Sequence, residues 1–153
     1  MPDVTPETKE LFAKLHMNMA TSEDLVAWAV SLLEEGIETK NVSILASLGK
    51  PLYPSEVDDY FRRSLKDLGW SFPESEDCLR EFMRDTAAKI LRNEISPFKG
   101  CEQIYQAVRG LDYPGDLIGW SCLYWGHDPH SYQDLSDDEF DASVRREAKL
   151  LAG

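Results

Sequence analysis

The sequence lacks a long hydrophobic run and has few cysteines. Its longest nearly apolar stretch, residues 117–125, is nine residues long, whereas a helix that spans a membrane needs about 20 apolar residues. The first residues also lack the basic and apolar regions of a secretory signal. The cysteines, Cys78, Cys101 and Cys122, show no C-x-x-C spacing, which is typical of reduced core residues. We therefore expect a cytoplasmic protein that neither spans a membrane nor depends on disulfide bonds.

Basic residues are scarce as well. The 153 residues include 16 Lys and Arg against 28 Asp and Glu, which gives a net charge of −12. Residues 1–38 hold eight acids and two bases, residues 111–153 hold nine acids and three bases, and the stretch between them is neutral. A nucleic-acid-binding face needs clustered Lys and Arg, so this class of function is disfavoured. Acidity either serves solubility alone or presents an acidic face to a basic partner.

Helix start and stop signals, by contrast, are abundant. Thr5-Pro6 and Ser96-Pro97 each join a capping residue to a proline at the first helical position, and residues 136–139 have the pattern of a capping box. Gly36, Gly49, Gly69 and Gly110 each follow an apolar helical pattern and mark helix ends. Between these signals apolar residues recur at helical spacing, and almost nothing alternates as in a strand. The sequence therefore predicts a single all-α domain over residues 1–153, a compact bundle of seven to eight short helices.

Two parts of the sequence share the same order of helix start and stop signals. Residues 33–37 precede a short helix and then residues 53–57, and residues 91–95 precede a helix and then residues 113–117. The similarity of these patterns suggests two stacked helix–turn–helix units that arose by internal duplication. The favoured interpretation is that capped helices use the same start and stop residues wherever they occur.

His127 and His130, with Cys122 upstream, form the densest cluster of candidate metal ligands. A structural zinc site needs three or four ligands, usually in two well-spaced pairs. Pro129 interrupts the helical spacing between the two histidines, and the remaining histidine, His16, is distant in the sequence. A polar turn after the seventh helix is the favoured interpretation, so we expect neither a metal ion nor another cofactor.

Residues for covalent or acid–base catalysis are not arranged in a recognisable motif. No serine or histidine lies in a nucleophile elbow or triad pattern, although a triad can be assembled from distant residues. The cysteines occupy positions at or near apolar helix faces, where burial makes a thiol inert. Paired acids such as Asp58-Asp59 and Asp137-Asp138 adjoin bases or stand in first turns, where they complement the helix dipole. The sequence therefore favours a protein without catalytic residues.

The nearly apolar segment 117–125 has apolar residues on more than one helix face. Helical spacing divides them into two sets: Leu117, Trp120 and Tyr124 on one side, and Ile118, Cys122 and Trp125 on the other. A helix of this kind is either central in the core or meets another protein with one of its faces. Its Trp and Tyr are residue types that dominate interface energetics.

An acidic tract follows this segment. Residues 128–141 contain six acids and neither Lys nor Arg. An aromatic patch beside an acidic one is a plausible contact surface for a basic protein, because opposite charges steer association. The sequence therefore predicts these partner-binding residues: Trp120, Tyr124, Trp125, Asp134, Asp137, Asp138 and Asp141.

Four segments of the sequence resemble segments of small bacterial helical proteins without an assigned activity: residues 32–39, 44–48, 93–97 and 111–114. The resemblance covers about half of the chain. It implies a bacterial, cytosolic, all-helical protein. Some proteins of this size and acidity are immunity proteins that neutralise a toxin, and the resemblance supplies no functional residues of its own.

The sequence thus favours a non-enzymatic, acidic helical module that binds a basic protein. Such a module is an inhibitor, an immunity protein or a regulator that acts by covering its partner. The alternative is a metal-dependent or small-molecule-binding protein that uses the region of His127, His130 and Cys122.

Overall fold

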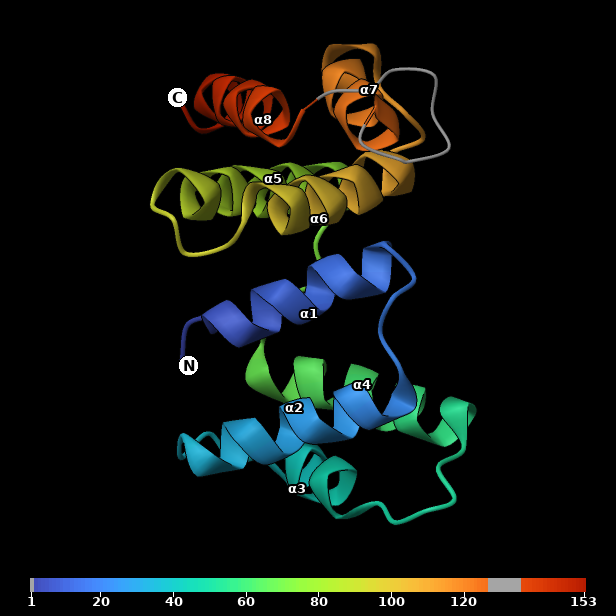
Figure 1. Ribbon diagram of the computed structural model, residues 1–153. Coiled ribbons are helices and arrows are strands. Elements are labelled where there is room, and N and C mark those ends of the chain that lie inside the picture. The colour runs from blue at the N-terminus through green and yellow to red at the C-terminus, as the bar shows by residue number, and fades with distance from the viewer. Residues whose placement is uncertain (1, 127–135) are drawn as a thin grey trace. The chain divides into compact units, whose positions relative to one another are not determined.

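The computed structural model describes residues 2–126 and 136–153, and every regular element in them is helical. The predicted all-α fold class is therefore confirmed. The chain divides into two compact units, Met1–Glu74 and Ser75–Gly153, which are described separately below (Figure 1). That the two units behave as one domain stays a prediction, because compactness does not decide whether they unfold together. Within the described ranges no helix is both long and apolar enough to cross a membrane.

The N-terminal unit contains four helices: α1 (Pro6–His16), α2 (Ser22–Glu34), α3 (Lys40–Ser47) and α4 (Pro54–Leu68). Threonine side chains cap the first three. Thr5 accepts a hydrogen bond from the backbone N–H of Thr8, and Thr39 accepts one from Val42. Thr21 and Asp24 bond each other's backbone N–H reciprocally, at 3.2 and 2.8 Å. Because these bonds satisfy amides that have no partner within the helix, they fix where each helix begins.

The core of the N-terminal unit is built around Trp28. Its ring packs edge-on against Phe61 of α4, with 5.0 Å between the ring centroids. Its indole N–H donates to the hydroxyl of Thr8 on α1 at 2.9 Å, and Thr8 is fully buried. A buried indole N–H without an acceptor would be costly, so this bond ties α1 to α2 in one orientation.

The C-terminal unit contains α5 (Ser75–Leu91), α6 (Pro97–Gly110), the short 3₁₀ helix η1 (Gly115–Leu117), α7 (Ile118–Gly126) and α8 (Asp137–Ala152). Helices α5 and α6 form one layer, and α7 and α8 form a second layer packed on it (Figure 1). The fully buried side chains between the layers include Leu79, Met83, Ile104, Trp120 and Phe140.

The turns after α2 and α5 have the same local geometry. Gly36 and Asn93 adopt positive φ angles of 82° and 60°. The next backbone N–H returns to the last turn of the helix, from Ile37 to Leu32 at 2.8 Å and from Glu94 to Lys89 at 2.9 Å. These are Schellman turns, which many helices use to satisfy their last carbonyl groups. Shared turn chemistry is sufficient to explain the similarity, so internal duplication stays a prediction.

Helix α6 lies close to α5 at Gly100. A Cβ atom there would collide with the side chain of Ile90 on α5. Alanine normally stabilises a helix interior relative to glycine, but overpacking a core costs about 1–3 kcal/mol. We expect Gly100→Ala to lower the free energy of unfolding by about that amount, measured by urea denaturation.

Two further variants test the physical reason. Gly49→Ala should change the free energy of unfolding by less than about 0.5 kcal/mol, because nothing lies within 4 Å of a Cβ at that position. Adding Ile90→Val, which removes a colliding methyl group, should recover part of the stability lost in Gly100→Ala. A Gly100→Ala protein as stable as the parent would contradict this account.

Candidate functional site

Helix α7 has one buried face and one exposed face. Leu117, just before the helix, Trp120 and Leu123 are buried. Ile118 is 63% exposed and Trp125 is 52% exposed, and Cys122 between them is exposed as well. The nine residues of α7 include no charged side chain. An apolar surface therefore lies on one side of α7, and we call Ile118, Cys122 and Trp125 the α7 surface.

Trp120 is not part of this surface. It is only 2% exposed and belongs to the core between the two layers of the C-terminal unit. A side chain buried to this extent cannot contact a partner unless the unit opens. We therefore remove Trp120 from the predicted partner-binding residues and assign it to the core.

Three aromatic side chains pack around Tyr105 of α6, and one of them, Trp125, belongs to the α7 surface. Tyr124 stacks on Tyr105, with 4.2 Å between centroids and 6° between ring planes. Trp125 meets Tyr105 edge-on at 5.9 Å. Tyr113 lies on another side at 6.4 Å, with 3.5 Å between the two hydroxyl oxygens. Burial and the contact with Tyr113 raise the pKa of Tyr105, so Tyr105 keeps its proton at neutral pH.

The backbone holds Tyr113 in an uncommon conformation. Asp112 and Tyr113 have φ angles of 60° and 55°, and each left-handed residue other than glycine costs on the order of 1 kcal/mol. The N–H of Tyr113 bonds the carbonyl of Val108 at 3.0 Å, which closes the end of α6. The consequence is a half-exposed Tyr113 ring beside Tyr105. Local sequence signals do not indicate this pairing, because Tyr105 lies at a buried position of α6 and Tyr113 lies in the turn before η1.

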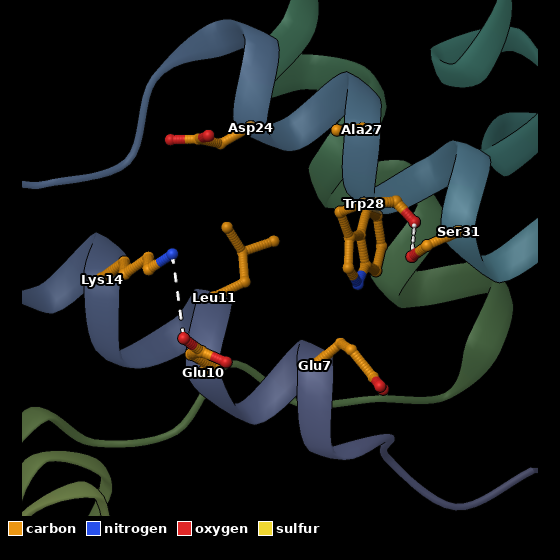
Figure 2. A pocket seen from close by; sticks show the side chains of 8 residues that line it. All are labelled: Glu7, Glu10, Leu11, Lys14, Asp24, Ala27, Trp28 and Ser31. Carbon is orange, nitrogen blue, oxygen red and sulfur yellow. Dashed lines mark hydrogen bonds and ion pairs between the residues drawn. The ribbon is translucent and has the colours of Figure 1, made fainter. Parts of the chain in front are cut away.

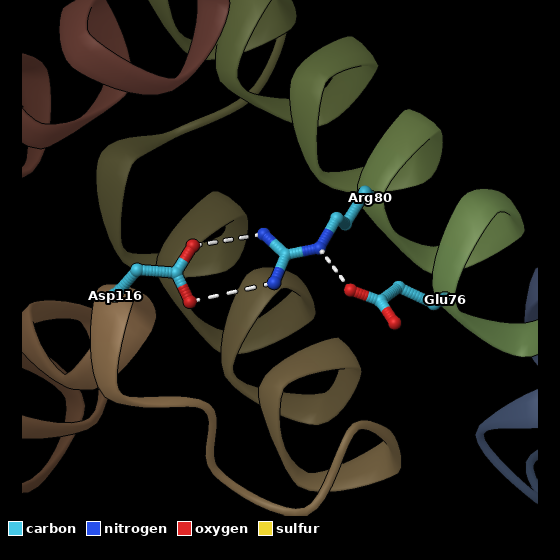
Figure 3. A network of polar contacts seen from close by, with 3 residues as sticks. All are labelled: Glu76, Arg80 and Asp116. Carbon is cyan, nitrogen blue, oxygen red and sulfur yellow. Dashed lines mark hydrogen bonds and ion pairs between the residues drawn. The ribbon is translucent and has the colours of Figure 1, made fainter.

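An ion-pair network holds the start of α7 against α5. Arg80 of α5 donates two bonds to the carboxylate of Asp116 in η1, at 2.9 and 3.3 Å, and a third to Glu76 at 3.2 Å (Figure 3). The guanidinium lowers the pKa of Asp116, and the two carboxylates raise the pKa of Arg80. A bidentate pair of this geometry restricts orientation as well as distance. It therefore positions the segment from which α7 begins.

Those predicted acidic residues that the structure describes lie at the beginning of α8. Asp137, Asp138 and Asp141 are exposed, and none forms an ion pair with a described residue. The hydroxyl of Ser136 accepts a hydrogen bond from the N–H of Glu139, so α8 begins where the sequence predicted. First-turn acids stabilise a helix through its dipole, and their charge stays available to a partner. Asp134 lies outside the described residues.

The cysteines differ in exposure. Cys78 and Cys101 are buried, and burial raises their thiol pKa to about 11 and about 12. The expectation that Cys122 lies at a buried position is wrong, because its position on α7 faces away from the core. His127 and His130 lie outside the described residues. Within residues 2–126 and 136–153, no three His, Cys, Asp or Glu side chains are placed to hold a metal ion.

Comparisons with known proteins give no family for this chain. No family model matches it, and neither the curated proteins nor the solved structures include a match. The resemblance to small bacterial helical proteins therefore stays a prediction.

The exposure of Trp125 can be measured by fluorescence quenching. Trp28, Trp70 and Trp120 are buried, so Trp125 is the accessible indole among the four tryptophans. We expect acrylamide to quench a minor, red-shifted part of the emission, and Trp125→Phe to abolish that part. Trp70→Phe, which removes a buried indole, should retain it. A quenchable component that persists in Trp125→Phe would contradict the exposed position of Trp125.

The three thiols should differ in reactivity. Deprotonation of Cys78 and Cys101 is strongly disfavoured and both are buried, whereas Cys122 is open to solvent. In the native protein, a disulfide reagent such as dithiobisnitrobenzoate should titrate one thiol rapidly, and all three after denaturation. Cys122→Ser should eliminate the rapid phase, and Cys101→Ser should leave it unchanged. Rapid reaction of two or more native thiols would show that the core assignment is incorrect.

Proposed function

We propose that this chain is a non-enzymatic protein-binding module, an inhibitor, immunity protein or regulator, that acts by covering a basic partner. The observation that carries the proposal is the exposed face of α7, where Ile118 and Trp125 are more than half exposed on a helix without charge. Single exposed apolar residues are common on protein surfaces, whereas a contiguous group marks a contact site.

The residue types on this surface suit binding. Tryptophan and tyrosine are enriched among the residues that contribute most to interface affinity. Trp125 and Tyr113 are both half-exposed and both pack against Tyr105. Rings that are already held in place lose little conformational entropy when a partner binds. The aromatic cluster therefore gives the α7 surface a rigid base.

The charge of the chain favours a basic partner over a second copy. At a net charge of −12, two copies repel each other as they approach. The exposed acids at the beginning of α8 attract a positively charged protein and raise its association rate. Asp116 contributes little to this attraction, because Arg80 neutralises it.

Affinity capture from the host's lysate, with purified protein as bait, tests the proposal. We expect one basic partner at low salt and less of it at high salt, since screening weakens electrostatic attraction. With that partner purified, Trp125→Ala should lower affinity by about 2 kcal/mol, roughly thirtyfold. Asp137→Asn with Asp138→Asn should mainly slow association.

Leu150→Ala provides the matched control for Trp125→Ala. Leu150 is the most exposed large apolar side chain of α8 in the same unit, so its loss should change neither affinity nor stability noticeably. Urea denaturation of both variants separates binding from folding. The proposal fails if Trp125→Ala binds the partner as the parent does, or if its loss of binding follows an equal loss of folding stability.

A further inference from the structure

A groove of about 190 Å³ lies between α1 and α2 in the N-terminal unit (Figure 2). Leu11 and Trp28 form its apolar floor, with Ala27 beside them. Three carboxylates and one ammonium group line it, from Glu7, Glu10 and Lys14 on α1 and from Asp24 on α2. We propose that this groove binds the side chain of an arginine presented by a protein partner.

The charge around the groove is negative. Glu7 forms no ion pair with a described residue. Glu10 faces Lys14, but the two charged atoms are 3.8 Å apart and both side chains are about half exposed, so the pair is weak. Asp24 uses one oxygen to accept the N–H of Thr21 at 2.8 Å. Three acids against one base therefore leave an attractive field for a cation.

The floor of the groove is rigid. The Trp28 indole is held by its hydrogen bond to Thr8 and by its edge-on contact with the ring of Phe61. Ser31 at the end of the groove donates its hydroxyl to the carbonyl of Trp28 at 2.8 Å, so that hydroxyl is already engaged (Figure 2). An occupant thus meets fixed apolar atoms below and carboxylates around it. This combination suits a ligand with an apolar stem and a cationic end.

The size of the groove selects between classes of ligand. Pockets for small molecules and cofactors usually measure about 300–1,000 Å³, and this groove is smaller. It accommodates one long side chain. Asp24 lines the groove from α2, and Glu7, Glu10 and Lys14 line it from α1 (Figure 2). A planar guanidinium presents five donors and can bond carboxylates on both sides, whereas an ammonium is a compact and strongly hydrated charge. Arginine therefore fits the groove better than lysine.

This site lies in the N-terminal unit and does not depend on the α7 surface. The probe for it is N-acetylarginine methylamide, titrated into the labelled full-length protein while the indole N–H signal of Trp28 is followed by NMR. We expect a saturable shift at concentrations on the order of millimolar. The corresponding citrulline derivative, a neutral compound of nearly the same shape, should give none. The lysine derivative should bind more weakly.

Variants of the wall residues locate the site. Glu7→Gln should weaken binding of the arginine probe about threefold to fivefold, the effect of removing one exposed charge. Glu56→Gln is the matched control, because Glu56 is likewise an exposed acid in the first turn of a helix, α4, and lies outside the groove. A peptide Gly-Gly-Arg-Gly-Gly should bind at least as well as the blocked amino acid, since the proposed occupant belongs to a protein.

Several results would overturn this assignment. The citrulline derivative could shift the Trp28 signal as much as the arginine probe does, or the lysine derivative could bind as tightly as the arginine probe. Glu7→Gln could bind the arginine probe with the affinity of the parent protein, or the peptide could fail to bind. None of these results changes what is expected of the partner captured through the α7 surface. Equally, if Trp125→Ala does not affect capture of that partner, the expected result of the arginine titration stays the same. The two proposals are therefore tested independently of each other.

Discussion

Helices of eight to seventeen residues, the range found among the described helices, have little stability in water by themselves. Each one therefore depends on burying an apolar face against its neighbours. Caps such as Thr21 and Ser136 set where a helix begins, but they contribute only about 1 kcal/mol each. The packing of Trp28 against Phe61 in one unit, and of Trp120 in the other, supplies what the caps cannot.

Helix α7 shows what this dependence means for function. With nine residues it must bury Trp120 and Leu123 to exist at all. Arg80 adds a second attachment by holding Asp116 at the start of the segment. Gly119 allows α7 to lie close to α8, because a Cβ there would be 3.3 Å from the carboxylate of Glu147. With one face held in this way, the opposite face can stay apolar and exposed without loss of the fold.

The acidic residues of this protein serve structure and surface at once. Acids in the first turns of α1, α2 and α8 complement the helix dipoles. The same positions place Glu7 and Asp24 beside the groove and Asp137 and Asp138 on an exposed end of α8. Because a helix N-terminus needs only a nearby negative charge, its acids remain able to meet a cationic group from outside. This is why Glu7, Asp24, Asp137 and Asp138 can serve both a helix start and a proposed contact site.

The sequence by itself determined the helical class and most helix boundaries, because capping residues, prolines and turn glycines act on the backbone within a few residues. It also divided α7 correctly into two sets of residues, with Ile118, Cys122 and Trp125 on one side. It could not say which of the sets is buried, because a helix that is apolar all round has no polar face to indicate the solvent. Only packing against α6 and α8 decided that Trp120 is core and Cys122 is exposed. The cluster around Tyr105 and the groove between α1 and α2 likewise bring together residues from different helices, and local sequence signals do not encode such distances.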